Sequence, residues 1–142
     1  MAQSGNGVVN WTTFGQTRAL IGNDFAQILS YYRDDAAKNV VAVEQAYKLR
    51  DAVSMVRPAH TLKGDSLQFG GEAIGRLAEH IEHSARRCVE EHSAPDSLDA
   101  EILRLRPLLI ETLAQFEKEL KNSAAAAMRR PPVAAGFGRK SI

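Results

Sequence analysis

Apolar residues recur every three or four positions along most of the chain, which is the spacing of one face of an α-helix. No stretch alternates apolar and polar residues over a useful length, as a strand would. We therefore expect an all-α fold, an antiparallel four-helix bundle with a short additional N-terminal helix. The predicted helices cover about residues 11–21, 25–49, 52–69, 72–89 and 98–124.

Polar and glycine residues mark the predicted helix ends. Asn23 or Asp24 can cap the second helix and Asp51 the third, while Gly70-Gly71 ends the third helix. Pro58 and Pro107 fall inside helical patterns and should kink or divide those helices. We predict a flexible leader over residues 1–10, a bundle over 11–124 and a flexible basic tail over 125–142.

Charge and composition narrow the class of protein. The 142 residues have a net charge of +1, but without Arg129, Arg130, Arg139 and Lys140 only 14 basic residues remain against 17 acidic ones. A nucleic-acid partner is therefore not expected, because such domains concentrate basic charge on the folded part. Cys88 is the single cysteine, and the chain has neither a signal-peptide pattern nor a long apolar run. We expect a cytoplasmic protein with no membrane association.

The segment around His60 carries the strongest functional signal. Lys63 and Gly64 follow His60 by three and four residues, so on a helix both lie beside the imidazole. Lys63 supplies a cation, and Gly64 leaves space at a position where glycine costs roughly 1 kcal/mol relative to alanine. An accessible nitrogen nucleophile beside a cation is what a histidine needs to accept a phosphoryl group.

The helical projection also places apolar residues around His60. Val53, Val56, Arg57 and Leu67 lie within roughly 60° of it, whereas Met55, Leu62, Ser66 and Phe69 lie on the opposite, core-facing side. Apolar residues on an outward helix face indicate a docking surface. We therefore predict a partner site at Val53, Val56, Arg57 and Leu67, and a partner seated there would also exclude water.

The segment resembles the signature of histidine-containing phosphotransfer (HPt) domains. The resemblance lies in the sequence AHTLKG at 59–64, the small Ser66 and the following Phe69-Gly70, and more loosely covers about 24–120. It implies a four-helix bundle whose exposed histidine takes a phosphoryl group from a receiver-domain aspartate and passes it to another receiver. It makes His60 the phosphoacceptor, Lys63 the group that neutralises the phosphoryl oxygens, and Gly64 the source of clearance.

The resemblance assigns further residues and partners. Glu82 stands 22 positions after His60, where the family often has a polar residue that holds the other ring nitrogen, and Arg86 matches a position that is basic in some members. Expected partners are receiver domains of response regulators and a hybrid or upstream histidine kinase. The chain should bind no cofactor, with Mg²⁺ held by the receiver. It has no glycine-rich nucleotide loop, so we expect a monomeric phosphoryl carrier without ATP-dependent kinase activity.

Some alternatives stay open. The chain could be the phosphoacceptor domain of a chemotaxis-type histidine kinase, or a helical adaptor that is never phosphorylated. A metal site in Glu79–His83 is disfavoured because its histidines are three rather than four positions apart. Asp65, at a position usually small and uncharged in the family, and Pro58 depart from the pattern without removing a chemical requirement.

Overall fold

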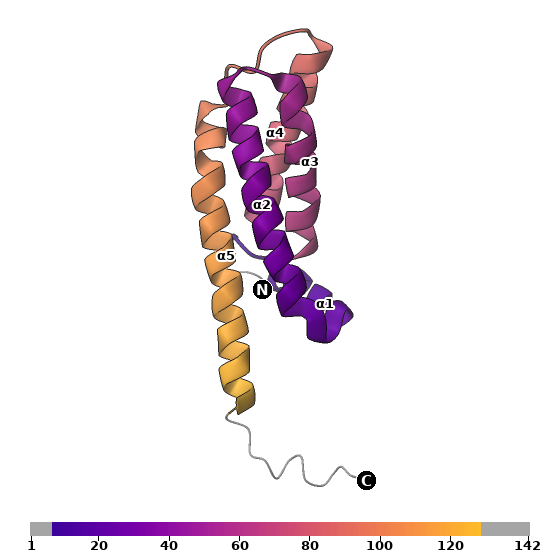
Figure 1. Ribbon diagram of the computed structural model, residues 1–142, viewed down its shortest axis with the longest axis vertical. Coiled ribbons are helices and arrows are strands. Elements are labelled where there is room, and N and C mark those ends of the chain that lie inside the picture. Colours follow the sequence, from indigo (N-terminus) through magenta and orange to yellow (C-terminus); the bar gives the residue numbers. More distant parts are fainter. Residues whose placement is uncertain (1–6, 129–142) are drawn as a thin grey trace.

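The structure is a computed structural model, and it describes residues 7–128. Five α-helices are present in this range and no strand, which confirms the predicted all-α class (Figure 1). A single 3₁₀ turn, Gly22–Asp24, joins the first two helices. The helices are α1 Trp11–Ile21, α2 Phe25–Lys48, α3 Ala52–Gln68, α4 Glu72–Glu90 and α5 Asp99–Met128.

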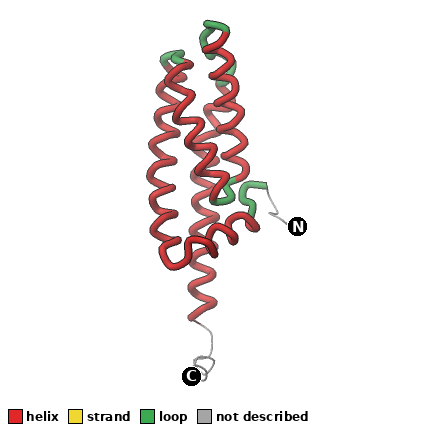
Figure 2. Tube along the Cα trace, turned by 90° about the vertical axis from the view of Figure 1, so that its right-hand side faces the viewer, coloured by secondary structure: helices red, strands yellow, loops and turns green. Residues whose placement is uncertain are grey.

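Helices α2 to α5 form the predicted antiparallel bundle. The chain runs up α2, down α3, up α4 and down α5, with short connections at both ends (Figures 1 and 2). Each helix packs against the next, and α5 closes the bundle by contacting both α2 and α4. The α3–α4 interface therefore lies on the side of the bundle opposite the α2–α5 interface. Helix α1 lies across the end of the bundle where α2 begins, and α5 continues past it (Figure 2).

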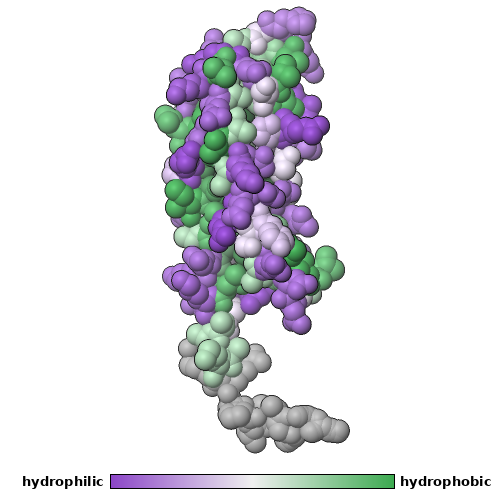
Figure 3. Space-filling model, viewed as in Figure 1, coloured by the Kyte–Doolittle hydropathy of each residue, from purple (hydrophilic) through white to green (hydrophobic). Residues whose placement is uncertain are grey.

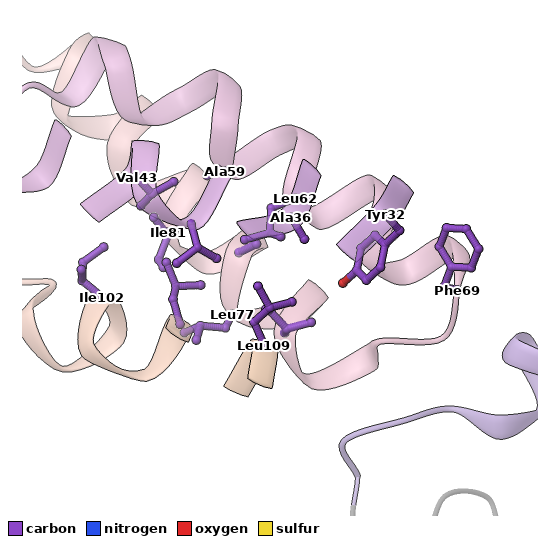
Figure 4. Close-up of a cluster of buried hydrophobic side chains, with 14 of the residues drawn as sticks. Tyr32, Ala36, Val43, Ala59, Leu62, Phe69, Leu77, Ile81, Ile102 and Leu109 are labelled. Atoms are coloured by element: carbon purple, nitrogen blue, oxygen red, sulfur yellow. The ribbon is translucent and has the colours of Figure 1, made fainter. Parts of the chain in front are cut away.

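The core takes one apolar side from each helix of the bundle. Figure 4 shows part of it, and Met55, Ala59, Ile74, Ile81 and Leu105 are among its fully buried side chains. An aromatic cluster closes the end covered by α1, where neighbouring ring centroids lie 5.0–6.4 Å apart. The cluster consists of Trp11, Phe14, Phe25, Tyr32, Phe69 and Phe116.

The helix ends follow the predicted signals in two of three cases. The Asp51 carboxylate accepts a hydrogen bond from the Ser54 amide at 3.2 Å, and Gly70 ends α3 with φ +88°. A Cβ at Gly70 would lie 2.5 Å from the Asn10 carbonyl oxygen, so glycine is required there. The capping bond predicted for Asn23 or Asp24 is not formed, because the Gly22–Asp24 turn leads directly into α2.

The predicted domain limits need correction at both ends. Val8 and Val9 are buried, and the Asn10 amide donates to the Gly70 carbonyl at 2.7 Å, so the last part of the expected leader packs against the bundle. Helix α5 continues to Met128, beyond the predicted limit of 124. The remaining leader and tail residues, 1–6 and 129–142, lie outside the described residues.

Both prolines that fall inside the predicted helical patterns lie in continuous helices. Pro58 lies within α3 and Pro107 within α5, and neither divides its helix. No helix between residues 7 and 128 is long and apolar enough to cross a membrane.

Candidate functional site

His60 lies on α3 at the edge that faces α4. Its side chain is 58% exposed, and its Nδ1 lies 3.0 Å from Oε2 of Glu82 on α4. An ionised carboxylate can only accept hydrogen bonds, so Nδ1 carries the proton and donates it to Glu82. In this tautomer Nε2 keeps its lone pair, which makes it the nucleophilic nitrogen of the ring.

Glu82 is the centre of a cluster of charged side chains, which we call the Glu82 cluster: His60, Lys63, Glu82 and Arg86. Glu82 is 3% exposed. Nε and Nη2 of Arg86 each lie 2.9 Å from Oε2, and Nζ of Lys63 lies 3.1 Å from Oε1. One carboxylate thus faces two permanent cations and the imidazole.

The cluster keeps Glu82 ionised. Burial by itself raises the pKa of the Glu82 carboxyl. The contacts from Lys63, Arg86 and His60 have the larger effect and lower the pKa to about 2. The carboxylate is therefore negatively charged across the physiological range and holds one imidazole orientation. Removing it would leave the Lys63 and Arg86 cations facing each other.

Gly64 leaves open space beside this cluster. A Cβ built at Gly64 has no neighbouring atom within 4 Å, and the residue is exposed. Backbone packing therefore gives no reason for glycine at this helix-interior position. That this space serves as clearance for His60 stays a prediction.

A shallow groove adjoins the Glu82 cluster between α3 and α4. Its volume is about 350 Å³, and we call it the α3–α4 groove. Its lining combines three apolar with three charged side chains. The lining residues are Val53, Val56 and Arg57 of α3 with Arg86, Val89 and Glu90 of α4.

Comparison with known proteins identifies the family. The model of the Hpt domain family matches residues 27–126, which runs from the first turn of α2 almost to the end of α5. The chain belongs to the Hpt domain family. A search of curated proteins found no match, and neither did a search of solved structures. Hpt domains serve in histidine phosphotransfer within phosphorelays and interact with receiver domains and histidine kinases.

Within this Hpt domain, four of the predicted site residues lie together in the Glu82 cluster. Glu82 contacts His60 through the expected ring nitrogen. The Lys63 ammonium lies 3.1 Å from Oε1 of Glu82, the oxygen that His60 does not contact, and the Lys63 side chain is 22% exposed. Arg86, which the sequence tied to the site only by resemblance, bonds the same oxygen as His60.

The residues of the apolar patch predicted around His60 lie at different depths in the structure. Leu67 is half-buried and lies over Gly75, where an added Cβ would be 2.5 Å from its Cδ2 atom. A projection of α3 alone could not show that α4 covers this position. Val56 is also half-buried, whereas Val53 is 69% exposed. Val89 of α4, which the predicted patch does not include, is 38% exposed and lines the α3–α4 groove.

Ser66, Asp65 and His80 of this Hpt domain each have a neighbour on another helix. The Ser66 hydroxyl bonds the Tyr32 hydroxyl at 2.6 Å in the core, and burial raises the pKa of the Asp65 carboxyl, with Asp35 nearby adding to the effect. His80 lies 3.6 Å from Glu101 of α5. Between residues 7 and 128 no group of three or more His, Cys, Asp or Glu side chains could hold a metal ion.

Proposed function

We propose that this Hpt domain accepts a phosphoryl group on Nε2 of His60 from the aspartyl phosphate of a receiver domain and passes it to a second receiver. One observation carries the assignment: the 3.0 Å contact between Nδ1 of exposed His60 and the buried, ionised Glu82. This contact fixes the tautomer in which Nε2 is the nucleophile. His80 is the only other histidine in the described range with an acidic partner here, and that contact is 3.6 Å long.

The transfer releases no small molecule, because the phosphoryl group passes directly from the aspartate oxygen to Nε2. The Nε2 lone pair forms a bond to phosphorus while the bond between phosphorus and the aspartate oxygen breaks, which returns the receiver carboxylate. The Nδ1 proton stays on the ring, so the phosphorylated imidazole gains a positive charge that faces Glu82. Transfer to the next receiver is the same exchange in reverse, because positioning and charge neutralisation dominate such reactions.

The charges of the Glu82 cluster suit this exchange. The Lys63 and Arg86 cations exceed the Glu82 anion by one positive charge, and Arg86 is half exposed beside the imidazole. We assign to both cations the task of balancing the phosphoryl oxygens, and to Glu82 that of orienting His60. No cofactor is assigned to this chain, and the resemblance places the Mg²⁺ on the receiver.

The receiver would dock over His60 and the adjoining α3–α4 groove. Exposed Val53 and Val89 contribute apolar surface to the groove, and Arg57 and Arg86 also line it. Interfaces typically combine an apolar centre with a polar rim. The two arginines suit the acidic surroundings of a receiver's phosphorylated aspartate.

The decisive experiment incubates the chain with a phosphorylated receiver domain and measures acid-labile, alkali-stable phosphate on it. His60→Gln should abolish labelling and leave the helical circular dichroism unchanged. His83→Gln is the matched control, because His83 is also exposed and lies next to Glu82 in sequence. It should be labelled like the wild type.

Two results would contradict the proposal. Persistent labelling of His60→Gln would move the phosphoacceptor to another histidine. A wild-type chain that binds receivers but never carries phosphate would instead be the helical adaptor considered above.

A further inference from the structure

The α2–α5 interface carries an open groove on the side of the bundle away from His60. Two adjoining hollows of about 330 and 230 Å³ share Arg33 and Leu113, so they form one continuous feature, the α2–α5 groove. It extends along α2 from Ala26 to Val41, which corresponds to about 22 Å of helix. Its apolar lining includes Leu29, Ala37 and Val41 of α2 with Ile110, Leu113 and Leu120 of α5.

Apolar side chains stand exposed along this groove. Ile110 is 62% exposed and Val41 37%, and Leu103, two turns before Ile110 on the same side of α5, is 76% exposed. The outward side of a surface helix is normally polar. Figure 3 looks onto this side of the molecule, where apolar side chains lie between α5 and α2 and charged ones surround them. The groove is an unpartnered apolar surface.

An ion pair fixes which residues of the two helices lie at the same level. Arg106 of α5 contacts Glu44 of α2 through both Nε and Nη2. Eleven residues before Glu44 is Arg33, and eleven residues after Arg106 is Glu117. Since α2 and α5 are antiparallel, Arg33 and Glu117 also share a level, and both line the lower part of the groove. Val41 lies three residues before Glu44 and Ile110 four residues after Arg106, so the two lie within one residue of a common level in the upper part.

We propose that the α2–α5 groove is the interface of a homodimer of this chain. A two-fold axis parallel to the groove places α2 of one copy against α5 of the other at the same level. Residues that match across the groove in one chain then meet between chains: Val41 faces Ile110, and Arg33 faces Glu117. Each contact occurs twice by symmetry. The contact then has apolar side chains at one level and opposite charges at another, and Arg33, which contacts Asp34 of its own chain at 3.2 Å, gains Glu117 of the second copy as a further acidic partner.

This arrangement leaves both phosphotransfer sites accessible. His60 lies at the α3–α4 interface, on the opposite side of each copy, so it faces away from the dimer contact. A receiver could dock on each copy without meeting the second one. The dimer replaces the monomer expected from the sequence and does not depend on His60 being phosphorylated.

Charge reversal combined with mixing tests the proposed contact. Sedimentation velocity should give a dimer mass for the wild type, while Arg33→Glu and Glu117→Arg should each raise the dissociation constant by about tenfold or more, since both contacts become repulsive. An equimolar mixture of the two variants should recover the dimer, because both contacts of the mixed dimer pair opposite charges. Arg104→Glu, an exposed reversal of α5 outside the groove lining, should leave the mass unchanged.

A second variant guards against loss of folding. Ile110→Asp should be monomeric with unchanged circular dichroism, because Ile110 is largely exposed. A wild type that stays monomeric up to about 100 µM overturns the proposal and leaves the groove to another protein. The proposal also fails if the single reversals remain dimeric, or if the folded variants do not recover the dimer on mixing.

Discussion

The two opposite helix interfaces of this bundle differ in where their charged side chains lie. At the α3–α4 interface a carboxylate, Glu82, is buried and its charge is balanced by Lys63, Arg86 and the His60 imidazole. At the α2–α5 interface the charged residues Glu44 and Arg106 pair at the surface. The middle of that interface is left to apolar side chains.

The difference shows what each interface is suited for. A buried carboxylate with fixed partners gives one orientation to an exposed imidazole, which is what a nucleophile needs. The α2–α5 groove is lined mainly by apolar side chains with a few charged ones, which suits docking of another chain. Close packing accompanies the first arrangement, since Leu67 lies directly over Gly75 of α4.

The largest expected effect is a difference between Glu82 and Glu44 in how the unfolding free energy depends on pH. The unfolded chain binds a proton at Glu82 near pH 4.5, whereas the folded chain does so only near its pKa of about 2. Protonation between these values favours unfolding, so Glu82 contributes up to about 3 kcal/mol above about pH 5, lost as the pH falls toward about 2. Urea unfolding at neutral and acidic pH should show that Glu82→Gln loses less stability on acidification than the wild type.

Glu44→Gln is the control for this measurement. In the Glu44–Arg106 pair the Arg106 side chain is 57% exposed and the Glu44 side chain 27%, and ion pairs at the surface contribute roughly 0–1 kcal/mol. Its acid response should therefore follow that of the wild type. Equal acid sensitivity of Glu82→Gln and the wild type would mean that Glu82 is not held ionised by its partners.

A second prediction tests the closeness of α3 and α4. A Cβ at Gly75 would lie 2.5–2.6 Å from Cδ2 and Cγ of Leu67, so Gly75→Ala must displace that side chain. We expect a loss of about 1–3 kcal/mol in unfolding free energy, typical of overpacking. Ala37→Leu places extra volume in the open α2–α5 groove and should be tolerated better. A similar loss in both variants would remove the contrast in packing.

The sequence predicted the fold because local signals and periodicity agreed with it. The apolar spacing predicted each helix to within a few residues. As expected, Asp51 caps the start of α3 and Gly70 ends it. The error at the N-terminal leader concerns long-range contacts. Val8 and Val9 are too few to show a helical period, and they are ordered by their contacts with the bundle rather than by a local pattern.

The candidate site was predicted in part for the same reason. The spacing of His60, Lys63 and Gly64 depends only on one helix, and the Glu82 contact followed from a family resemblance. The exposure of Leu67 and Val89 depends on how α3 and α4 lie against each other, which a single-helix projection does not contain. Nothing in the spacing alone showed that Lys63 and Arg86 share one carboxylate.

A third prediction compares acidic substitutions in the two grooves. Val53→Asp in the α3–α4 groove should weaken receiver binding by more than about 1 kcal/mol, because it places a charge at the centre of the proposed contact. Ile110→Asp in the α2–α5 groove should leave receiver binding unchanged. Calorimetric titration of each variant with one receiver measures both effects. Loss of binding in Ile110→Asp alone would reverse the assignment of the two surfaces.

The smallest expected effect concerns Gly64 and separates access from stability. The position is open and helical, so Gly64→Ala should raise the unfolding free energy by up to about 1 kcal/mol. Gly64→Gln should fold as well as the wild type but slow phosphoryl transfer strongly, because its longer side chain occupies the space beside His60. Urea unfolding and transfer rates measured on the same samples distinguish the two properties. A Gly64→Gln domain that transfers at the wild-type rate would show that clearance is not the reason for glycine beside the imidazole.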